Sequence, residues 1–204
     1  FSVDNSGTIT LQSDATHSAS LIVGETTSGK ITYKRYVKST GASPISPSDW
    51  HLIAAPVTTQ NIPSFVANAN NEVRKSSTTN NYAVAYYKND NRPKKQWTYH
   101  NASPSLENQE TLTNFNSGEG YAMVRKGNGT YTFEGSMANG DVTLNIPKVK
   151  SGSHLWSALG NPYPSFIPAN TNANASNNLL KNNFSCLDNN YAALYFWDDG
   201  KYTP

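Results

Sequence analysis

Aromatic and acidic side chains gather beside two polar turns of this sequence. An exposed indole or phenol ring can stack on the apolar face of a sugar, while carboxylates and amides bond its hydroxyl groups. This combination is typical of carbohydrate-binding surfaces. The candidate residues are Trp97, Tyr99, Trp197, Tyr202, Asp198 and Asp199. The alternative is that the rings fill the core of the fold, which is the commoner fate of a tryptophan in a strand.

The same polar stretches hold oxygen ligands of the kind that calcium prefers. Asp90 lies between two asparagines, and Asp188 precedes two asparagines. Carboxylate and amide oxygens bind Ca²⁺, but neither run has the regular ligand spacing of a known calcium loop. Asp90 and Asp188 are therefore weak calcium candidates, and we expect no other cofactor.

Other chemistries find little support in the residue types and their spacing. Four histidines stand singly, without the i, i+2 or i, i+4 partner that would place two zinc ligands on one face. There is no Gly-x-Ser-x-Gly motif, and the single cysteine, Cys186, excludes an internal disulfide. A glycosidase needs two facing carboxylates, and only Glu134, after Phe133, adjoins an apolar residue in a strand-like run. We therefore expect no enzymatic activity.

Composition excludes two further classes of protein. Only 15% of the residues are charged and the net charge is +2, so the surface is built mainly from uncharged polar groups. Nucleic-acid binding needs a basic stripe, and the basic pairs at 34–35 and 94–95 are short and isolated. No apolar run approaches the roughly 20 residues of a membrane-spanning helix. We expect neither a nucleic-acid partner nor a transmembrane segment.

An internal repeat organises the elements that must position these side chains. Three segments of the first half recur in the second half, in the same order and at nearly the same offset. The matched pairs are 50–56 with 156–162, 81–87 with 190–196, and the Pro-Ser-Phe at 63–65 with that at 164–166. Such a series predicts one supersecondary unit used twice.

Alternating apolar and polar residues between turn signals predict short β-strands along most of the chain. The clearest predicted strands are 30–37, 82–88, 97–99, 121–125, 130–135 and 142–146. The Gly-Asn-Gly at 127–129 predicts a tight hairpin turn, and 61–72 is the best candidate for a helix. The predicted fold is an all-β antiparallel β-sandwich built from two related sheet units, with one short helix at most.

Three segments follow from this pattern, although they can pack as one domain. Residues 1–40 form an N-terminal strand segment, 50–150 a first β unit with hairpins, and 151–204 a second unit that we interpret as truncated. The hairpin predicted at 118–134 has no counterpart in the second unit. We therefore expect an open sheet edge that pairs with another chain or with other domains of the same polypeptide.

The run from Trp156 to Ser165, WSALGNPYPS, resembles the W-x-L-x-G-N-P-Y-P-S segment of large secreted and surface proteins of the Bacteroidetes, although Leu159 stands one position later. Further similar segments are 118–121, 132–135 and 139–142. The resemblance implies a secreted β-rich module of the kind found upstream of type IX secretion sorting domains, often in adhesins. It implies no catalytic residues.

These observations favour a non-catalytic extracellular structural or adhesin-type β module of a larger secreted or cell-surface protein. The alternative is a carbohydrate-binding module that uses exposed tryptophan and tyrosine, with or without calcium. A polysaccharide hydrolase ranks third. An extracellular or bacterial cell-surface location is expected in each case, with an extracellular glycan as a further candidate partner.

Overall fold

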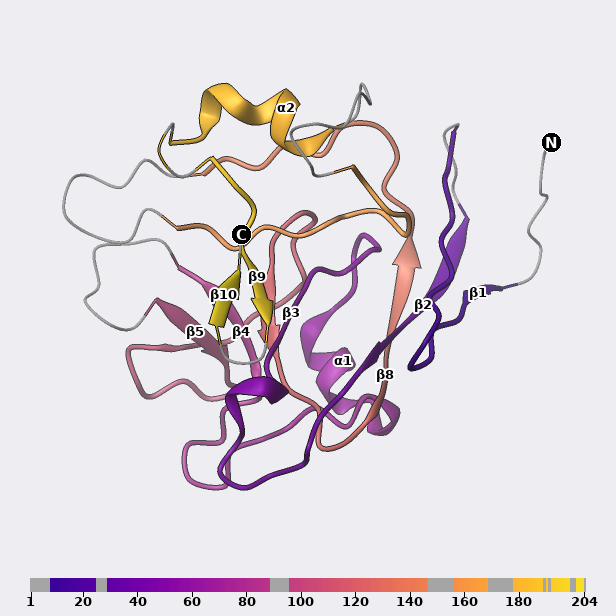
Figure 1. Cartoon of the computed structure of the whole chain (residues 1–204). Helices are drawn as coiled ribbons and strands as arrows, with labels where there is room; N and C mark the ends of the chain where they lie inside the picture. Colours follow the sequence, from indigo (N-terminus) through magenta and orange to yellow (C-terminus); the bar gives the residue numbers. More distant parts are fainter. Residues whose placement is uncertain are drawn as a thin grey trace.

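A computed structural model describes residues 8–24, 29–88, 96–146, 156–168, 178–188, 190, 192–198 and 201–203. Its strands are β1 (Ile9–Leu11), β2 (Lys30–Val37), β3 (His51–Ile53), β4 (Val84–Tyr87), β5 (Trp97–His100), β6 (Gln109–Glu110), β7 (Tyr121–Met123), β8 (Gly129–Ser136), β9 (Phe196–Asp198) and β10 (Lys201–Thr203). They form a three-stranded sheet β1-β2-β8, a five-stranded sheet β3-β7-β4-β5-β6 and a two-stranded sheet β10-β9 (Figure 1). The predicted all-β class is confirmed.

Most strand pairs are antiparallel, as the sequence predicts. The longest pairing joins β2 to β8 over eight residues, from Lys30 opposite Ser136 to Val37 opposite Gly129. Two pairs are parallel, β1 with β2 and β5 with β6. In both pairs the connection is longer than a tight turn, so the second strand can run in the same direction as the first.

Short helices fill the connections. The predicted helix is present as α1 (Ile62–Ala67), where the side chain of Asn61 accepts a hydrogen bond from the backbone N–H of Ser64 at 2.9 Å. A second helix, α2 (Leu179–Asn183), begins after Asn178, whose side chain accepts the N–H of Lys181 at 3.0 Å. The structure thus has one helix more than the sequence predicts. Asn178 lies at the end of an asparagine-rich stretch, so the sequence alone does not distinguish it as a helix cap. The short 3₁₀ turns are η1 (Pro47–Asp49), η2 (Ala69–Asn71) and η3 (Phe184–Cys186).

The core lies between the five-stranded sheet and the β2-β8 pair, and α1 closes one side. Phe65 of α1 stands at its centre, with ring centroids 5.1 Å from Phe115, 5.6 Å from Tyr131 and 4.8 Å from Phe133. The inner face of the five-stranded sheet contributes Val84, Tyr121 and Met123, while β2 adds Ile31 and Val37. This two-sheet packing around one core is the arrangement expected of a sandwich.

Two predicted strand features differ in the structure. The Gly-Asn-Gly at 127–129 does turn the chain, but β7 and β8 belong to different sheets and do not pair. Local turn chemistry fixes the direction of the chain and not the partner of the next strand. The segment 142–146 alternates as a strand would, yet it pairs with no other described strand.

Side-chain amides occupy the free edge of β8. Asn71 is fully buried, and its Oδ1 accepts the backbone N–H of Thr132 at 2.7 Å while its Nδ2 donates to the carbonyl of Phe65 at 3.0 Å. The Oε1 of Gln60 accepts the N–H of Glu134 at 2.7 Å. These amides satisfy backbone donors that a further strand would otherwise bond.

Both copies of the repeat pair with the same segment, 119–123, and they do not form the two related sheets that the sequence predicts. In the first copy Ile53 pairs with Tyr121, and in the second the equivalent Leu159 pairs with Glu119. The N–H of Gly120 donates to the carbonyl of Ala158 at 3.0 Å. Each copy also supplies a hairpin, β4-β5 in the first and β9-β10 in the second.

The surroundings of the repeated tryptophans therefore differ. Trp50 is partly buried against Tyr99, whereas Trp156 is 50% exposed and contacts Tyr195. Within the described residues of the second copy, only β9 and β10 are regular strands, and β9 pairs with β10 alone. The open edge expected there, and its partner, stay a prediction.

The three predicted segments form one packed body. The N–H of Leu21 donates to the carbonyl of Pro164 at 2.7 Å, and the hydroxyl of Tyr163 donates to the carbonyl of Gly140 at 2.7 Å. β2 of the first segment pairs with β8 of the second. No helix in the described ranges is long and apolar enough to cross a bilayer.

A close approach between the repeat copies can be tested directly. A Cβ added to Gly160 would overlap the Cβ of Ala54, so Gly160→Ala is expected to lower the free energy of unfolding by about 1–3 kcal/mol. Adding Ala54→Gly removes the overlapping atom, so the double variant should be more stable than G160A alone. Urea denaturation of both single variants and the double variant gives the coupling energy. Losses that simply add would contradict this contact.

Candidate functional site

The face of the five-stranded sheet that points away from the core carries aromatic side chains. Along β5, Thr98 and His100 are buried toward the core, where burial lowers the pKa of His100. Because side chains alternate along a strand, Trp97 and Tyr99 lie on the opposite face, and both are partly buried. The register places Tyr87 of β4 beside Trp97.

Two rings meet across the middle of this face. Trp50 precedes β3, and its ring centroid lies 6.2 Å from that of Tyr99 on β5. Two strands, β7 and β4, separate β3 from β5, so their backbones are about 14 Å apart. The rings can meet because the intervening residues on this face are Ala85 and Ala122, which lie buried beneath them. Small residues in the sheet thus leave room for large rings above it.

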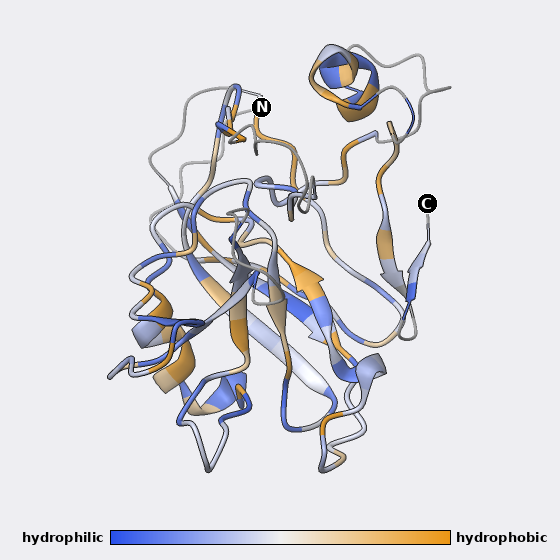
Figure 2. Cartoon of the chain, turned by 90° about the vertical axis from the view of Figure 1, so that its left-hand side faces the viewer, coloured by the Kyte–Doolittle hydropathy of each residue, from blue (hydrophilic) through white to orange (hydrophobic). Residues whose placement is uncertain are grey.

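The β9-β10 hairpin extends this face. Figures 1 and 2 place it in front of the five-stranded sheet, on the side away from α1. The indole N–H of Trp197 donates to the carbonyl of Pro47 in η1 at 3.2 Å, which attaches β9 close to Trp50. The ring of Trp197 contacts Tyr202 edge to face at a centroid distance of 5.0 Å. Burial raises the pKa of Tyr87, and the nearby phenol of Tyr202 raises it further.

We call this surface the aromatic face. Its members are Trp50, Tyr87, Trp97, Tyr99, Trp197 and Tyr202. The rings touch edge to face, with Tyr87 and Trp97 at 5.2 Å and 77°, so the surface is ridged. Tyr202 is 53% exposed and gives the surface its most accessible ring. Recognition surfaces are enriched in such partly exposed tryptophan and tyrosine.

A buried carboxylate shapes the loop that carries Trp50. Asp49 is 1% exposed and accepts the backbone N–H of Thr40 at 2.6 Å and its hydroxyl at 2.8 Å. Burial alone would raise the pKa of Asp49, but the hydrogen bonds from Thr40 and Ser46 and the charge of Arg74 outweigh it and lower this pKa. Asp49 therefore stays ionised and fixes the loop that presents both Trp50 and the carbonyl of Pro47.

The structure brings together the four aromatic residues that the sequence singles out, Trp97, Tyr99, Trp197 and Tyr202. The backbone of Asp198 pairs with Lys201 at the end of β9, and Asp199 lies outside the described residues. Trp50 and Tyr87 were not predicted as site residues. The repeat marks Trp50, but only the strand register shows that either residue lies on this face.

The structure describes the surroundings of one of the two calcium candidates, so calcium binding stays a prediction. Asp188 is exposed, and its carboxylate accepts the backbone N–H of Asn190 at 2.8 Å, which is the hydrogen bond of an ordinary Asx turn. Asp90 lies outside the described residues. Among the residues that are described, no group of three or more His, Cys, Asp or Glu side chains could hold a metal ion.

Comparisons with protein-family models, with curated proteins and with solved structures gave no match to this chain. What the molecule binds must therefore be inferred from the aromatic face and its surroundings.

Proposed function

We propose that this chain is a non-catalytic, adhesin-type β module of a larger secreted or cell-surface protein, and that the aromatic face is its attachment surface. The observation that carries the proposal is the gathering of six aromatic rings outside the core, from segments as distant in sequence as Trp50 and Tyr202. A partly desolvated group of tryptophan and tyrosine is the composition that dominates binding energy at protein surfaces.

The core does not require these rings. It has its own aromatic centre around Phe65 on the other face of the sheet. A further exposed apolar side chain on this face of the sheet is that of Leu52 on β3, which is 38% exposed and pairs with Ala122. An apolar surface in such a position is typical of a place where something binds.

Carbohydrate is the second candidate for what binds there. Four rings that the sequence identifies as potential sugar-stacking residues lie on one surface, and its tyrosines carry hydroxyl groups that can form hydrogen bonds. Tryptophan and tyrosine combine an apolar ring with a polar group, as a sugar combines an apolar face with hydroxyls. The resemblance to secreted Bacteroidetes modules supports an extracellular location where such ligands are displayed.

Replacing Trp97 with alanine tests the attachment surface. We expect retention on an array of glycans and immobilised extracellular proteins to fall about tenfold or more, because truncating a central aromatic anchor costs about 2 kcal/mol or more of binding free energy. The matched control is Phe184→Ala, since Phe184 is 48% exposed and lies in η3. Circular dichroism establishes that both variants fold. A folded W97A that binds as the parent does would contradict the proposal.

A further inference from the structure

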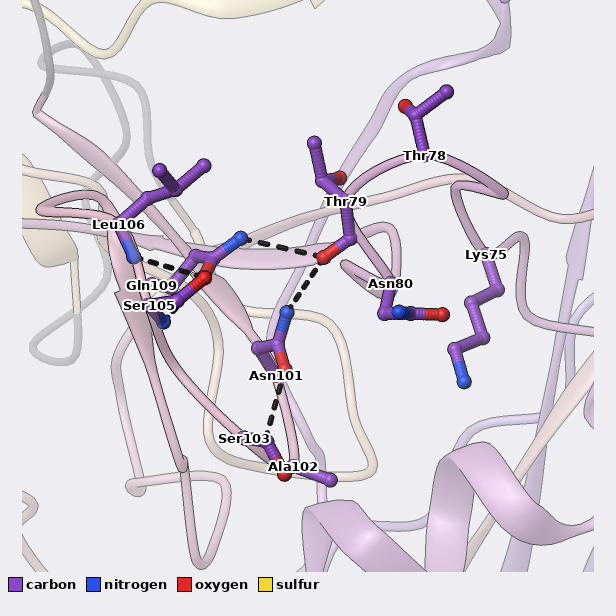
Figure 3. A pocket seen from close by; sticks show the side chains of 10 residues that line it. All are labelled: Lys75, Thr78, Thr79, Asn80, Asn101, Ala102, Ser103, Ser105, Leu106 and Gln109. Carbon is purple, nitrogen blue, oxygen red and sulfur yellow. Dashed lines mark hydrogen bonds between the residues drawn. The ribbon is translucent and has the colours of Figure 1, made fainter.

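A polar depression of about 560 Å³ lies at the opposite end of β5 from Trp97. Figure 3 shows its two walls, one formed by the turn at 78–80 with Lys75, and the other by the loop at 101–106. The depression is half open, and its volume suits one or two sugar rings or a molecule of similar size.

Two buried amides hold these walls together. Asn101 donates from Nδ2 to the carbonyl of Thr79 at 2.9 Å, and its Oδ1 accepts the N–H of Ser103 at 2.9 Å. Gln109 accepts the N–H of Ser105 at 2.8 Å and donates to Asn81 at 2.6 Å. Both amides are almost fully buried and bonded, so the depression is formed in advance of any ligand.

Other polar groups remain available on the walls. Asn80 holds a left-handed backbone conformation with φ of 58°, and its side-chain amide makes no hydrogen bond within the described part of the chain. The ammonium of Lys75 lies 4.9 Å from the ring centroid of Tyr82, which itself stacks on His100. This contact leaves the positive charge of Lys75 at the wall, and no Asp or Glu is among the described residues that line the depression.

We propose that this depression binds a carboxylate-bearing sugar unit, a uronate. The ammonium of Lys75 supplies the charge partner for the carboxylate. The amide of Asn80 and the hydroxyl of Ser103, which come from the two opposite walls, bond the ring hydroxyls. The site is separate from the aromatic face and does not depend on it.

Digalacturonate and its dimethyl ester form a matched pair of probes, because esterification removes both negative charges and leaves every ring hydroxyl in place. We expect chemical-shift titration of the ¹⁵N-labelled chain to show the acid binding with a dissociation constant of about 1 mM or below. The ester should bind about tenfold more weakly, and added salt should weaken binding of the acid. Equal affinity for acid and ester, or no binding of the acid at about 10 mM, overturns the proposal.

Two variants locate the site. Lys75→Met removes the ammonium but keeps an apolar stem, and Asn80→Gly removes the amide while tolerating the left-handed backbone. Each should weaken digalacturonate binding, K75M by about tenfold or more. Lys126→Met, at an exposed lysine outside the depression, should bind as the parent does. If K75M or N80G binds digalacturonate as tightly as the parent, or if K126M loses as much affinity as they do, the proposed site is wrong. Trp97→Ala should leave this binding unchanged, which separates its outcome from that of the attachment surface.

Discussion

Arg125→Met is expected to lower the free energy of unfolding by about 3–5 kcal/mol. The Arg125 side chain is almost fully buried, and its Nη1 lies 2.8 Å from the carboxylate of Glu72. The same guanidinium donates to the carbonyls of Gly127 at 2.9 Å, Asn128 at 2.7 Å and Asn70 at 3.1 Å. It thereby joins the turn between β7 and β8 to η2, and methionine would fill the space while leaving these oxygens without donors.

Urea denaturation measures the loss. Arg125→Lys is expected to lose most of the same stability, because one ammonium cannot reach acceptors that a planar guanidinium bonds together. The control is Arg35→Met, at an exposed arginine on β2, which should change stability by no more than about 0.5 kcal/mol. A loss below about 1 kcal/mol in R125M would show that the guanidinium does not hold this turn.

Asp49→Asn is expected to lower the free energy of unfolding by about 2–3 kcal/mol at neutral pH, because asparagine has one oxygen fewer for its buried donors and no charge. The folded-state pKa of Asp49 is lowered from 3.8, since hydrogen bonds from Thr40 and Ser46 and the charge of Arg74 together exceed the effect of burial. A lowered carboxyl pKa contributes stability that is fully present above the unfolded pKa of about 3.9. That contribution is lost as the pH falls through the folded pKa.

The pH dependence distinguishes this role from a simple loss of contacts. Denaturation of the parent and of D49N between about pH 2 and pH 7 should give curves that converge below about pH 4, because the parent then loses what the variant lacks. Asp141→Asn, at an exposed carboxylate, should keep the parent's stability at neutral pH. Curves that stay parallel down to the lowest pH would show that the Asp49 charge contributes nothing.

Local signals predicted individual elements well. The aromatic strand at 82–88 and its partner at 97–99 appear as the β4-β5 hairpin, and Asn61 with Pro63 marks the start of α1. Strand partners were harder to predict, because pairing depends on contacts between distant segments. The turn at 127–129 illustrates this limit, since it carries the chain from one sheet to the other.

The residues of the candidate site also differ in whether the sequence predicts them. Ring chemistry beside polar turns identified Trp97 and Tyr202, but Trp50 joins them only because small residues at Ala85 and Ala122 allow its ring to reach Tyr99. The polar depression had no signal in the sequence. Its walls are set by a buried Asn101 that bonds a backbone carbonyl 22 residues away, and any polar loop could contain such an asparagine.

The amides of Asn71 and Gln60 have a consequence for association between molecules at high concentration. Exposed strand edges of neighbouring molecules can join and start a growing ribbon. In β8 the donors of Thr132 and Glu134 are already engaged by side chains of the same molecule. This strand is therefore a poor template for strand addition between copies of the protein at high concentration.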